Sequence, residues 1–387
     1  DINCGVRLVR TDLRLKDAKG KLDELLNECY GSVPSGVGEG GSVRLNDERL
    51  DDLCTRGSAW AVDDGYAWEE DPSHTEGGGC LTEADPSALS DRARKRAMDQ
   101  VGTLGAGNHF LEIQAVDEIF DSETASAMGI DEPGQLTVMI HCGSRGFGHQ
   151  VCDDFIALMQ NAVKKYQIDL PDRQLGCAPV DSDEGQKYLR AMACAANYAW
   201  VNRQVIMHLV RGAFERVMGS SARKLGMGLV YDVAHNIAKI ERHEVEGEKK
   251  RLCVHRKGAT RAFPAGHPDL PEAYREVGQP VIVPGDMGTG SYLMVGTQRG
   301  YETAYGSTCH GAGRTMSRSA AKKLRHGREI IDELRSQGIL VRGGSTAGIA
   351  EEQPEAYKDV DEVIRAVEGA GLSKPVARVR PVAVMKG

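Results

Sequence analysis

The sequence has few aromatic residues and no apolar run long enough to cross a bilayer. Phe, Trp and Tyr make up only 5% of the 387 residues. The missing apolar run excludes a membrane-spanning helix. The first residues lack basic and apolar stretches, so we expect no signal peptide. Hydrophobic residues at 41% and charged residues at 27% exclude disorder and a coiled coil. The composition therefore predicts a globular protein with a sizeable core.

Paired cysteine motifs are also absent. The ten cysteines form no C-x-x-C pair and no zinc-finger spacing. In a chain of this length they do not suggest a disulfide framework. We therefore expect free thiols, a reducing compartment and a cytoplasmic location.

Charge is unevenly distributed along the chain. The net charge is −8, but the segment from Glu39 to Pro86 carries 13 acids and 3 bases, which leaves the remainder at +2. Basic residues gather late in the chain beside glycine-rich motifs, in 249–261 and 314–328. Such clusters are often solvated faces, but local patches also determine affinity for phosphate. The clusters are candidate phosphate-binding surfaces.

Hydrophobic periodicity predicts a mixed α and β fold. We expect one α+β domain over 1–387, in which the acidic segment 39–86 is irregular and has no assigned role. The expected strands are 110–116, 136–141, 229–234, 280–283 and 376–385. The expected helices are 90–100, 150–166, a pair within 184–218, 316–337 with Leu324, Ile330, Ile331 and Leu334 on one face, and 357–370.

Glycine-rich motifs carry most of the candidate functional side chains. The 46 glycines are well above the usual share. Asp, Cys and His adjoin glycine or asparagine at the ends of expected elements, in the motifs 1–7, 102–112, 141–146, 231–236 and 309–314. Carboxylate, thiolate and imidazole donors suit Mn²⁺, Zn²⁺ or Fe²⁺, and a bridging cysteine would allow two ions.

The usual nucleotide-handling motifs are missing. The sequence has no G-x-x-x-x-G-K-[ST], no H-E-x-x-H and no Lys-x-Asp-Gly. If a nucleotide is activated covalently, a neutral histidine is a candidate nucleophile, because imidazole can attack an α-phosphorus. The glycine loop 284–292 is either a phosphate-binding loop or only a turn.

Six motifs in register resemble the RtcB family of GTP-dependent RNA ligases. They are DINCGVR, GTLGAGNHFLE, HCGSRGFGHQ, DVAHN, PGDMGTGSY and CHGAGRTMSR, followed by a terminal MKG. The resemblance implies a ligase that joins RNA ends with a 2′,3′-cyclic phosphate or 3′-phosphate to 5′-hydroxyl ends, in tRNA splicing and RNA repair. It also implies GTP, two Mn²⁺ ions and an activating protein of archease type, with no membrane or DNA partner.

The resemblance assigns roles to individual residues. His310 would become guanylylated, and Cys4 would bridge the two Mn²⁺ ions. Asp1 and His109 would complete one metal site, and His141 and His235 the other. The implied GTP-binding residues are Asn108, Glu112, Asn236, Asp286, Ser291, Ala312, Gly313, Tyr357 and Lys386. The implied RNA-phosphate residues are Arg145, Arg314 and Arg318.

Two further expectations concern the chain's beginning and the alternatives to ligation. Family members carry a segment before the DINCGVR motif, so we expect that an N-terminal portion is missing here. A two-metal phosphatase or phosphodiesterase could use the same donors without guanylylation. A non-catalytic RNA-binding paralogue is the third alternative, but a pure binder would not need the Asp, Cys and His set.

Overall fold

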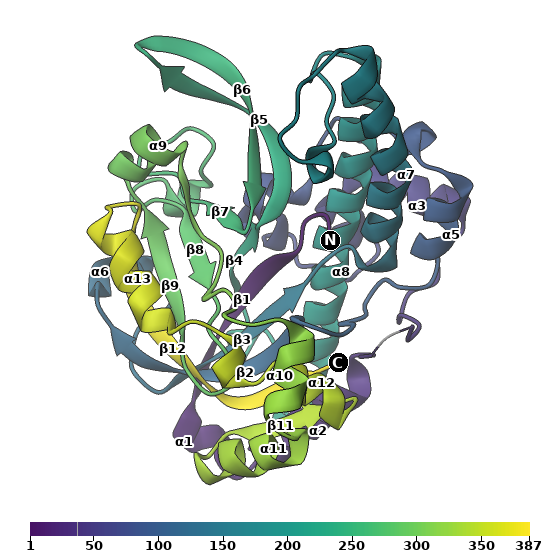
Figure 1. Cartoon of the computed structure of the whole chain (residues 1–387). Helices are drawn as coiled ribbons and strands as arrows, with labels where there is room; N and C mark the ends of the chain where they lie inside the picture. The colour runs from purple at the N-terminus through teal and green to yellow at the C-terminus, as the bar shows by residue number, and fades with distance from the viewer. Residues whose placement is uncertain (37) are drawn as a thin grey trace.

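The computed structural model describes residues 1–36 and 38–387, and its elements surround one curved sheet (Figure 1). The strands are β1 Gly5–Arg14, β2 Phe110–Ile119, β3 Gln135–Cys142, β4 Leu229–Ala234, β5 Asn236–Val245, β6 Glu248–Lys257, β7 Ala259–Arg261, β8 Pro280–Val283, β9 Ser291–Gly296, β10 Ser307–Cys309, β11 Leu340–Gly343 and β12 Ser373–Lys386. The helices are α1 Leu15–Ala18, α2 Leu22–Ser32, α3 Asp47–Arg56, α4 Ser58–Asp63, α5 Asp91–Ala97, α6 Ser122–Ala127, α7 Arg145–Lys165, α8 Asp183–Met218, α9 Gln298–Ala304, α10 Arg318–Leu324, α11 Gly327–Ser336, α12 Thr346–Glu351 and α13 Val360–Gly369. The mixed α and β class predicted from the sequence is confirmed.

The central sheet follows the order β4-β1-β3-β2-β12-β9-β8, with β11 parallel to β12. Its other pairings are antiparallel. The two end strands, β4 and β8, contact each other, so the sheet is nearly closed. Helix α8 packs against β3 and α2. This curved sheet brings strand ends that are distant in sequence to one side.

The register of four strands creates one polar edge. Gly5 of β1 pairs with Cys142 of β3 and with Ala234 of β4. On the other side of β3, His141 pairs with Phe110 of β2. The residues just outside these pairs, Cys4, His109 and His235, therefore lie at the same edge as His141. A tight fit fixes this register, because a Cβ on Gly5 would lie 2.1 Å from the Val233 carbonyl oxygen.

The predicted helix pair within 184–218 is wrong, because α8 is one helix of 36 residues. The Ser182 side chain caps its start by accepting from the backbone N–H of Gly185. Gly219 ends it in the left-handed conformation. The interior has no proline, and an interior Gly212 costs only about 1 kcal/mol relative to alanine. Packing of the buried Ala-rich face keeps the helix continuous.

The interpretation of 39–86 as irregular is also wrong, because the segment contains α3 and α4. Asn46 caps α3, and Leu50 and Leu53 on its inner face are fully buried. The acidic residues around them obscure this narrow apolar stripe in the sequence.

The expected helix over 316–337 divides into α10 and α11. The His326 side chain accepts from the Arg328 backbone N–H and starts a new helix. A Cβ on Gly327 would lie 2.0 Å from the Thr346 carbonyl oxygen, so the chain needs glycine at this turn. The break leaves Leu324 55% exposed, while Ile330 and Leu334 are buried as predicted.

The remaining element predictions hold within a few residues. The expected strands coincide with β2, β3, β4, β8 and β12, and the expected Ser90 cap precedes α5. Helix α7 begins five residues before the expected Gln150, and α13 begins three residues after the expected Tyr357. All ten cysteines are free in the described part of the chain. None of the described helices is long and apolar enough to cross a membrane.

Candidate functional site

Two groups of metal-binding side chains meet at the polar edge of the sheet. One group is Cys4, His141 and His235, and the other is Asp1, Cys4 and His109. Within each group the ligand atoms lie within 4.8 Å of one another. Cys4 belongs to both groups, so one thiol stands between two clusters of donors. The structure thus brings all five predicted metal ligands together, in the two sets that the family resemblance implies.

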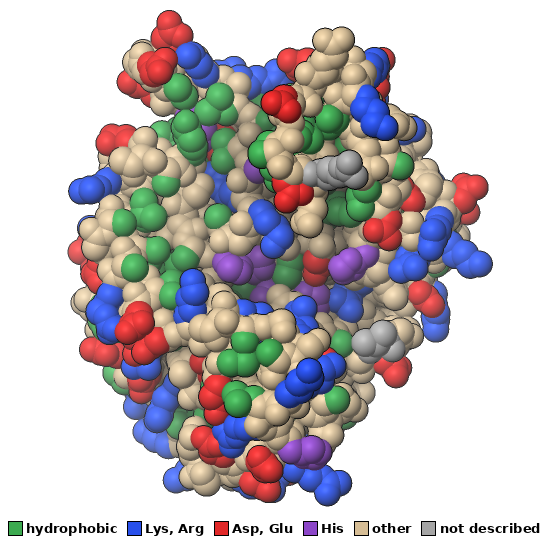
Figure 2. Space-filling view, in the orientation of Figure 1, with side chains coloured by type: hydrophobic (Ala, Val, Ile, Leu, Met, Phe, Trp, Pro, Cys, Tyr) green, Lys and Arg blue, Asp and Glu red, His purple; other side chains and the backbone are tan. Residues whose placement is uncertain are grey.

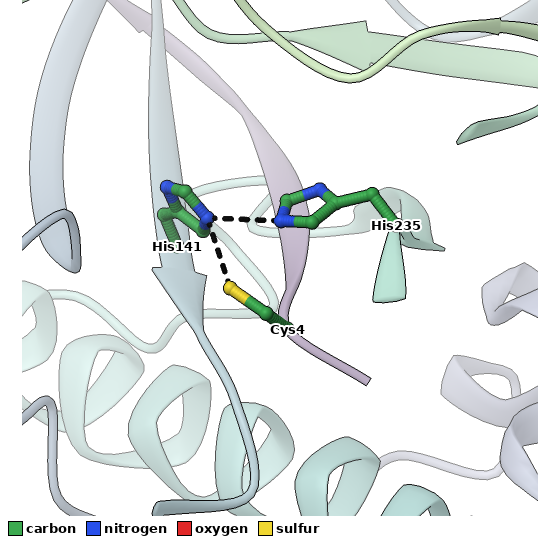
Figure 3. A group of neighbouring side chains, drawn as sticks. All are labelled: Cys4, His141 and His235. Carbon is green, nitrogen blue, oxygen red and sulfur yellow. Dashed lines mark hydrogen bonds between the residues drawn. The ribbon is translucent and has the colours of Figure 1, made fainter. Parts of the chain in front are cut away.

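The first group of metal-binding side chains contains two imidazoles, those of His141 and His235, beside the Cys4 thiol (Figure 3). His141 Nε2 lies 3.3 Å from Cys4 Sγ and 3.2 Å from His235 Nε2. Burial, together with the other histidines nearby, lowers the pKa of both imidazoles well below the ordinary value. Both rings are therefore neutral near pH 7, and neutral imidazole is the form that binds metal ions.

His109 is the imidazole of the second group. Its Nε2 lies 2.9 Å from Asp1 Oδ2 and 3.5 Å from Cys4 Sγ. Burial opposes protonation of His109, but the neighbouring Cys142 and Cys4 thiols raise its pKa to about 9. The Asp1 carboxylate is held in place because Oδ1 accepts from the Ser144 backbone N–H at 3.0 Å. The Asp1 carboxylate and the two thiols therefore favour a positive charge beside His109 Nε2. A divalent cation bound there would supply that charge.

The donor chemistry fits two divalent transition-metal ions. Thiolate and imidazole ligands favour Fe²⁺, Co²⁺ or Zn²⁺ over Mg²⁺ or Ca²⁺, which prefer oxygen ligands, and the Asp1 carboxylate also suits Mn²⁺. Metal binding in these clusters is therefore supported by the residues present.

Arg203 of α8 holds the loop that carries Cys4. Its guanidinium is fully buried and donates to the carbonyl oxygens of Asn3 at 2.7 Å and Cys142 at 2.9 Å. It also forms a bidentate pair with Asp232, at 2.8 Å for each contact. Asn3 adopts a left-handed conformation with φ 50°, which directs the chain into this turn. The interior of α8 thus fixes the donor-bearing ends of β1 and β3.

Replacing Arg203 with leucine should lower the free energy of unfolding by about 3–5 kcal/mol, because it leaves two buried carbonyl oxygens without this donor and leaves buried Asp232 paired with Arg7 alone. The measurement is the denaturant midpoint of the purified variant. The denaturant midpoint of Arg203→Lys should lie between those of the parent and Arg203→Leu, since lysine retains the charge but cannot make the bidentate contacts of the guanidinium. Arg216→Leu, on an exposed part of α8, is the control and should cost about 1 kcal/mol or less. Equal midpoints for both leucine variants would contradict the supporting role.

A cavity of about 410 Å³ opens beside the donor groups. Figure 2 shows this side of the molecule, where histidine side chains lie at the floor of a hollow. His310 lines the cavity, and its ring centroid lies 5.3 Å from that of His235. The cavity also contains most residues expected to bind nucleotide or RNA: Asn108, Glu112, Asn236, Asp286, Ala312, Gly313, Arg314, Arg318, Tyr357 and Lys386.

Glu112 and Lys386 approach this cavity from neighbouring strands. Strands β2 and β12 are paired in register, with Glu112 opposite Val384 and Lys386 opposite Phe110. Both side chains are buried. Burial raises the pKa of Glu112 to about 7. Strand β12 is buried from Pro381 to Lys386, so this part of the strand is docked in the sheet.

Glu352 connects the cationic side chains of the cavity. Its carboxylate lies 3.1 Å from Arg314, 3.2 Å from Arg318 and 3.8 Å from Lys386, and it accepts a hydrogen bond from the Tyr357 hydroxyl. Burial opposes ionisation of Glu352, but Lys386 and the other neighbours lower its pKa below the ordinary value. A buried, ionised Glu352 therefore aligns several groups that the sequence reasoning had assigned separately.

The structure places four predicted residues outside the wall of the cavity. His109 and His235 lie in the donor groups instead. Arg145 stands behind His109, with Nη1 2.8 Å from its Nδ1, and packs where a Cβ on Gly105 would clash. Ser291 accepts from the Gly285 backbone N–H and supports the 284–291 loop. In the same loop, Asp286 accepts from the backbone N–H groups of Gly288 and Thr289.

Sequence reasoning missed Lys257, Glu352 and Arg203 as site residues. Lys257 lines the cavity at the end of β6, but in the sequence it is one member of a basic cluster. Glu352 follows Glu351 and has no glycine beside it, so nothing marked it. Arg203 lies in the middle of a long helix, where arginine is usually a surface residue.

Comparison with known proteins gives the family directly. A family model described as tRNA-splicing ligase RtcB matches residues 1–387. Curated proteins named tRNA-splicing ligase RtcB are 56% identical in Archaeoglobus fulgidus, 54% in Methanococcus maripaludis and 53% in Nanoarchaeum equitans. Each match covers all of this chain and 80% of the relative. The chain belongs to the RtcB family.

Proposed function

We propose that this protein is an RNA ligase of the tRNA-splicing type. In this proposal it joins a 2′,3′-cyclic phosphate or 3′-phosphate end to a 5′-hydroxyl end at the expense of GTP. The carrying observation is that His310 lines a cavity that opens beside two donor groups, which share Cys4. The names of the similar proteins support the ligase activity and an RNA substrate.

The proposal assigns two Mn²⁺ ions to the donor groups. Asp1, Cys4 and His109 would hold one ion, and Cys4, His141 and His235 the other. When bound, the ions would offset the negative charge of the triphosphate. Cys4 as thiolate and His141 and His235 as neutral imidazoles present the lone pairs that such ligation needs.

His310 is the proposed nucleophile. Burial and the neighbouring Lys257 ammonium lower the pKa of its imidazole, so the ring is neutral at pH 7. An imidazole nitrogen attacks the α-phosphorus of GTP, the nitrogen–phosphorus bond forms and pyrophosphate leaves. The RNA 3′-phosphate then takes GMP from His310. The 5′-hydroxyl oxygen attacks the activated 3′-phosphorus, and GMP leaves as the strand is sealed. A cyclic phosphate must first be hydrolysed to the 3′-phosphate.

The remaining cavity residues bind nucleotide and RNA in this proposal. Glu112 and Lys386 read the guanine base, assisted by Tyr357 and Ser291. Asn108, Asn236 and Asp286 lie near the phosphates, and Ala312 and Gly313 near the ribose. Arg314 and Arg318, with Arg145 behind His109, attract RNA phosphate.

The cellular setting forms part of the same proposal. Ten free cysteines suit a reducing compartment, and we place the ligation in the cytoplasm. The family resemblance extends the proposal to an activating partner of archease type. RNA is the proposed nucleic-acid substrate, and no DNA substrate is expected.

Retention of label from α-labelled GTP tests the proposal against the phosphatase alternative. The protein is incubated with GTP and Mn²⁺ and then denatured. A ligase keeps GMP on the protein, whereas a two-metal phosphatase releases all of the label. The absence of labelled protein from an Mn²⁺-loaded sample would refute guanylylation.

The pH dependence of GTP binding should reveal Glu112. Guanine offers N1–H and N2–H donors, which an ionised carboxylate accepts. Because the pKa of Glu112 is raised to about 7, the acid form predominates below that pH and must lose a proton on binding. GTP affinity should therefore rise with pH from about 6 to about 8, by up to about tenfold per unit below the pKa.

Glu112→Gln is the matched control, since the triphosphate titrates identically in both proteins. Its affinity should be lower at pH 8 and should show less pH dependence than that of the parent. The parent should prefer GTP over ATP by about 10⁴-fold, and Glu112→Gln and Lys386→Ala should each reduce this preference. Binding calorimetry and adduct yield provide the two measurements. Unchanged selectivity in both variants would reject these residues as the guanine readers.

A further inference from the structure

The β5–β6 hairpin presents one face to the interior of the protein and the opposite face to a cleft. On the inner face, Lys239 pairs with Glu76 at 2.6 Å, and Arg256 pairs with Glu241 at 2.6 Å. On the cleft face, β6 contributes alternate residues from Lys249 to Lys257, and β5 contributes their cross-strand partners. Figure 1 shows the hairpin projecting from the sheet, with its turn bending to the upper left, above α9 and away from α7.

The cleft face carries a row of cations. Arg242 and Arg251 are directly opposite each other, and Lys249 and Lys257 lie on the same face of β6. All four are exposed. None of the four forms an ion pair with another described residue. Glu244, opposite Lys249, is the acid on this face. Alternate strand residues recur about every 6.6–6.8 Å, which suits the repeat of phosphates along an extended nucleic-acid strand.

The opposite wall of the cleft is apolar. A cavity of about 670 Å³ lies between the hairpin, α7, the 174–180 segment and α8. Phe155 and Tyr188 contribute aromatic rings to its lining, and Ile156 is 53% exposed. Among the described residues, no Asp or Glu lines this cavity. The hairpin residues that line this cavity are Ala238, Cys253 and His255, and Arg242, Lys249 and Arg251 lie on the same face nearer the turn. Cationic side chains that continue from an apolar and aromatic surface are typical of sites that hold unpaired nucleotides.

The cleft adjoins the cavity that contains His310 along the hairpin. His255 and Cys253 line the apolar cavity, whereas Lys257, two residues further along β6, lines the cavity that contains His310. Their cross-strand partners on β5 are divided between the same two cavities. Ala238, opposite His255, lines the apolar cavity, and Asn236, opposite Lys257, lines the cavity that contains His310. Figure 2 shows the hollow running between the hairpin and the α7 region towards the histidine side chains.

We propose that this cleft binds the unpaired RNA segment that continues from one of the two ends being joined. Phosphates lie against Arg242, Lys249 and Arg251, and bases lie against the apolar wall of α7 and α8. This inference rests on the proposed ligase function and adds a path for the RNA outside the catalytic cavity. The hairpin begins and ends in that cavity, so RNA held along it is delivered to His310.

The test measures RNA binding by Arg242→Gln/Lys249→Gln/Arg251→Gln. The control is Lys16→Gln/Lys19→Gln/Lys250→Gln, which removes the same total charge. Lys16 lies in α1, Lys19 caps the C-terminal end of α1, and Lys250 lies on the opposite face of β6. Fluorescent single-stranded RNAs of about three and about twelve nucleotides are used, with either a 3′-phosphate or a 5′-hydroxyl at the end that enters the site. Anisotropy gives the affinity and its salt dependence, and the GMP adduct is measured in parallel.

The cleft variant should bind one of the two long RNAs at least about tenfold more weakly than the parent, and the salt slope should decrease by about 2. Both short RNAs and the GMP adduct should be unaffected, and the control should match the parent. Long-RNA affinity equal to that of the control would overturn the proposal and point to a protein partner at this face. Failure of the parent itself to form an adduct or join RNA would refute the ligase function instead.

Discussion

Replacing His310 with alanine should abolish the GMP adduct, lowering its yield by about 10⁴-fold or more. His310 lies in the cavity beside both donor groups, and burial and Lys257 lower the pKa of its imidazole. A neutral ring has the lone pair that attack on phosphorus requires. Intact-protein mass after incubation with GTP and Mn²⁺ measures the adduct.

Lys257→Ala is the matched control for the nucleophile, because Lys257 lines the same cavity. It should still form an adduct, although more slowly. His310→Ala should retain the parent's unfolding temperature and metal content, since His310 belongs to neither donor group. An adduct on His310→Ala, or its loss only in Lys257→Ala, would identify a different nucleophile.

Replacing Cys4 with alanine should remove both metal ions together. Cys4 is the one residue shared by the two donor groups in the described part of the chain. Each group would retain only two ligands after the change, and loss of the thiolate also removes the negative charge between them. Metal stoichiometry by elemental analysis, after dialysis against Mn²⁺-free buffer, should fall from about two ions to near zero.

His109→Ala provides the comparison for the shared thiol. It removes a ligand from one group only, so one ion should remain bound to Cys4, His141 and His235. Guanylylation should decline in both variants, but the metal count separates them. Loss of a single ion from each variant would refute the bridging role of Cys4.

The elements that the sequence predicted well have strong local signals. Strand β3 is entirely buried and nearly all apolar or β-branched, so its pattern specifies a buried strand. Helix α5 follows Ser90, whose side chain caps it. In contrast, the break between α10 and α11 depends on the carbonyl of Thr346, which approaches Gly327 from a distant part of the chain. A contact of that kind leaves no trace in local periodicity.

The residues of the candidate site also divide into those with a local sequence signal and those without one. Cys4, His109, His235 and His310 adjoin glycine or asparagine at strand ends, and His141 lies two residues before Gly143. This local pattern is enough to predict a shared cavity rim. Glu352 and Arg203 have no such neighbours, because their roles arise from packing between distant segments. Glu352 meets Arg314 and Arg318 through packing between segments about 35 residues apart, and it meets Lys386 through the docking of β12 beside β2. Their positioning roles are therefore visible only in three dimensions.

A single-turnover transfer experiment tests the ligase proposal most directly. Protein charged with labelled GMP is freed of GTP and mixed with one RNA ending in a 3′-phosphate and another beginning with a 5′-hydroxyl. We predict that label leaves His310 and that joined RNA appears in the same molar amount as the GMP released. RNA joined with no loss of label, or a 3′-phosphate removed with no joining, would contradict ligation through His310.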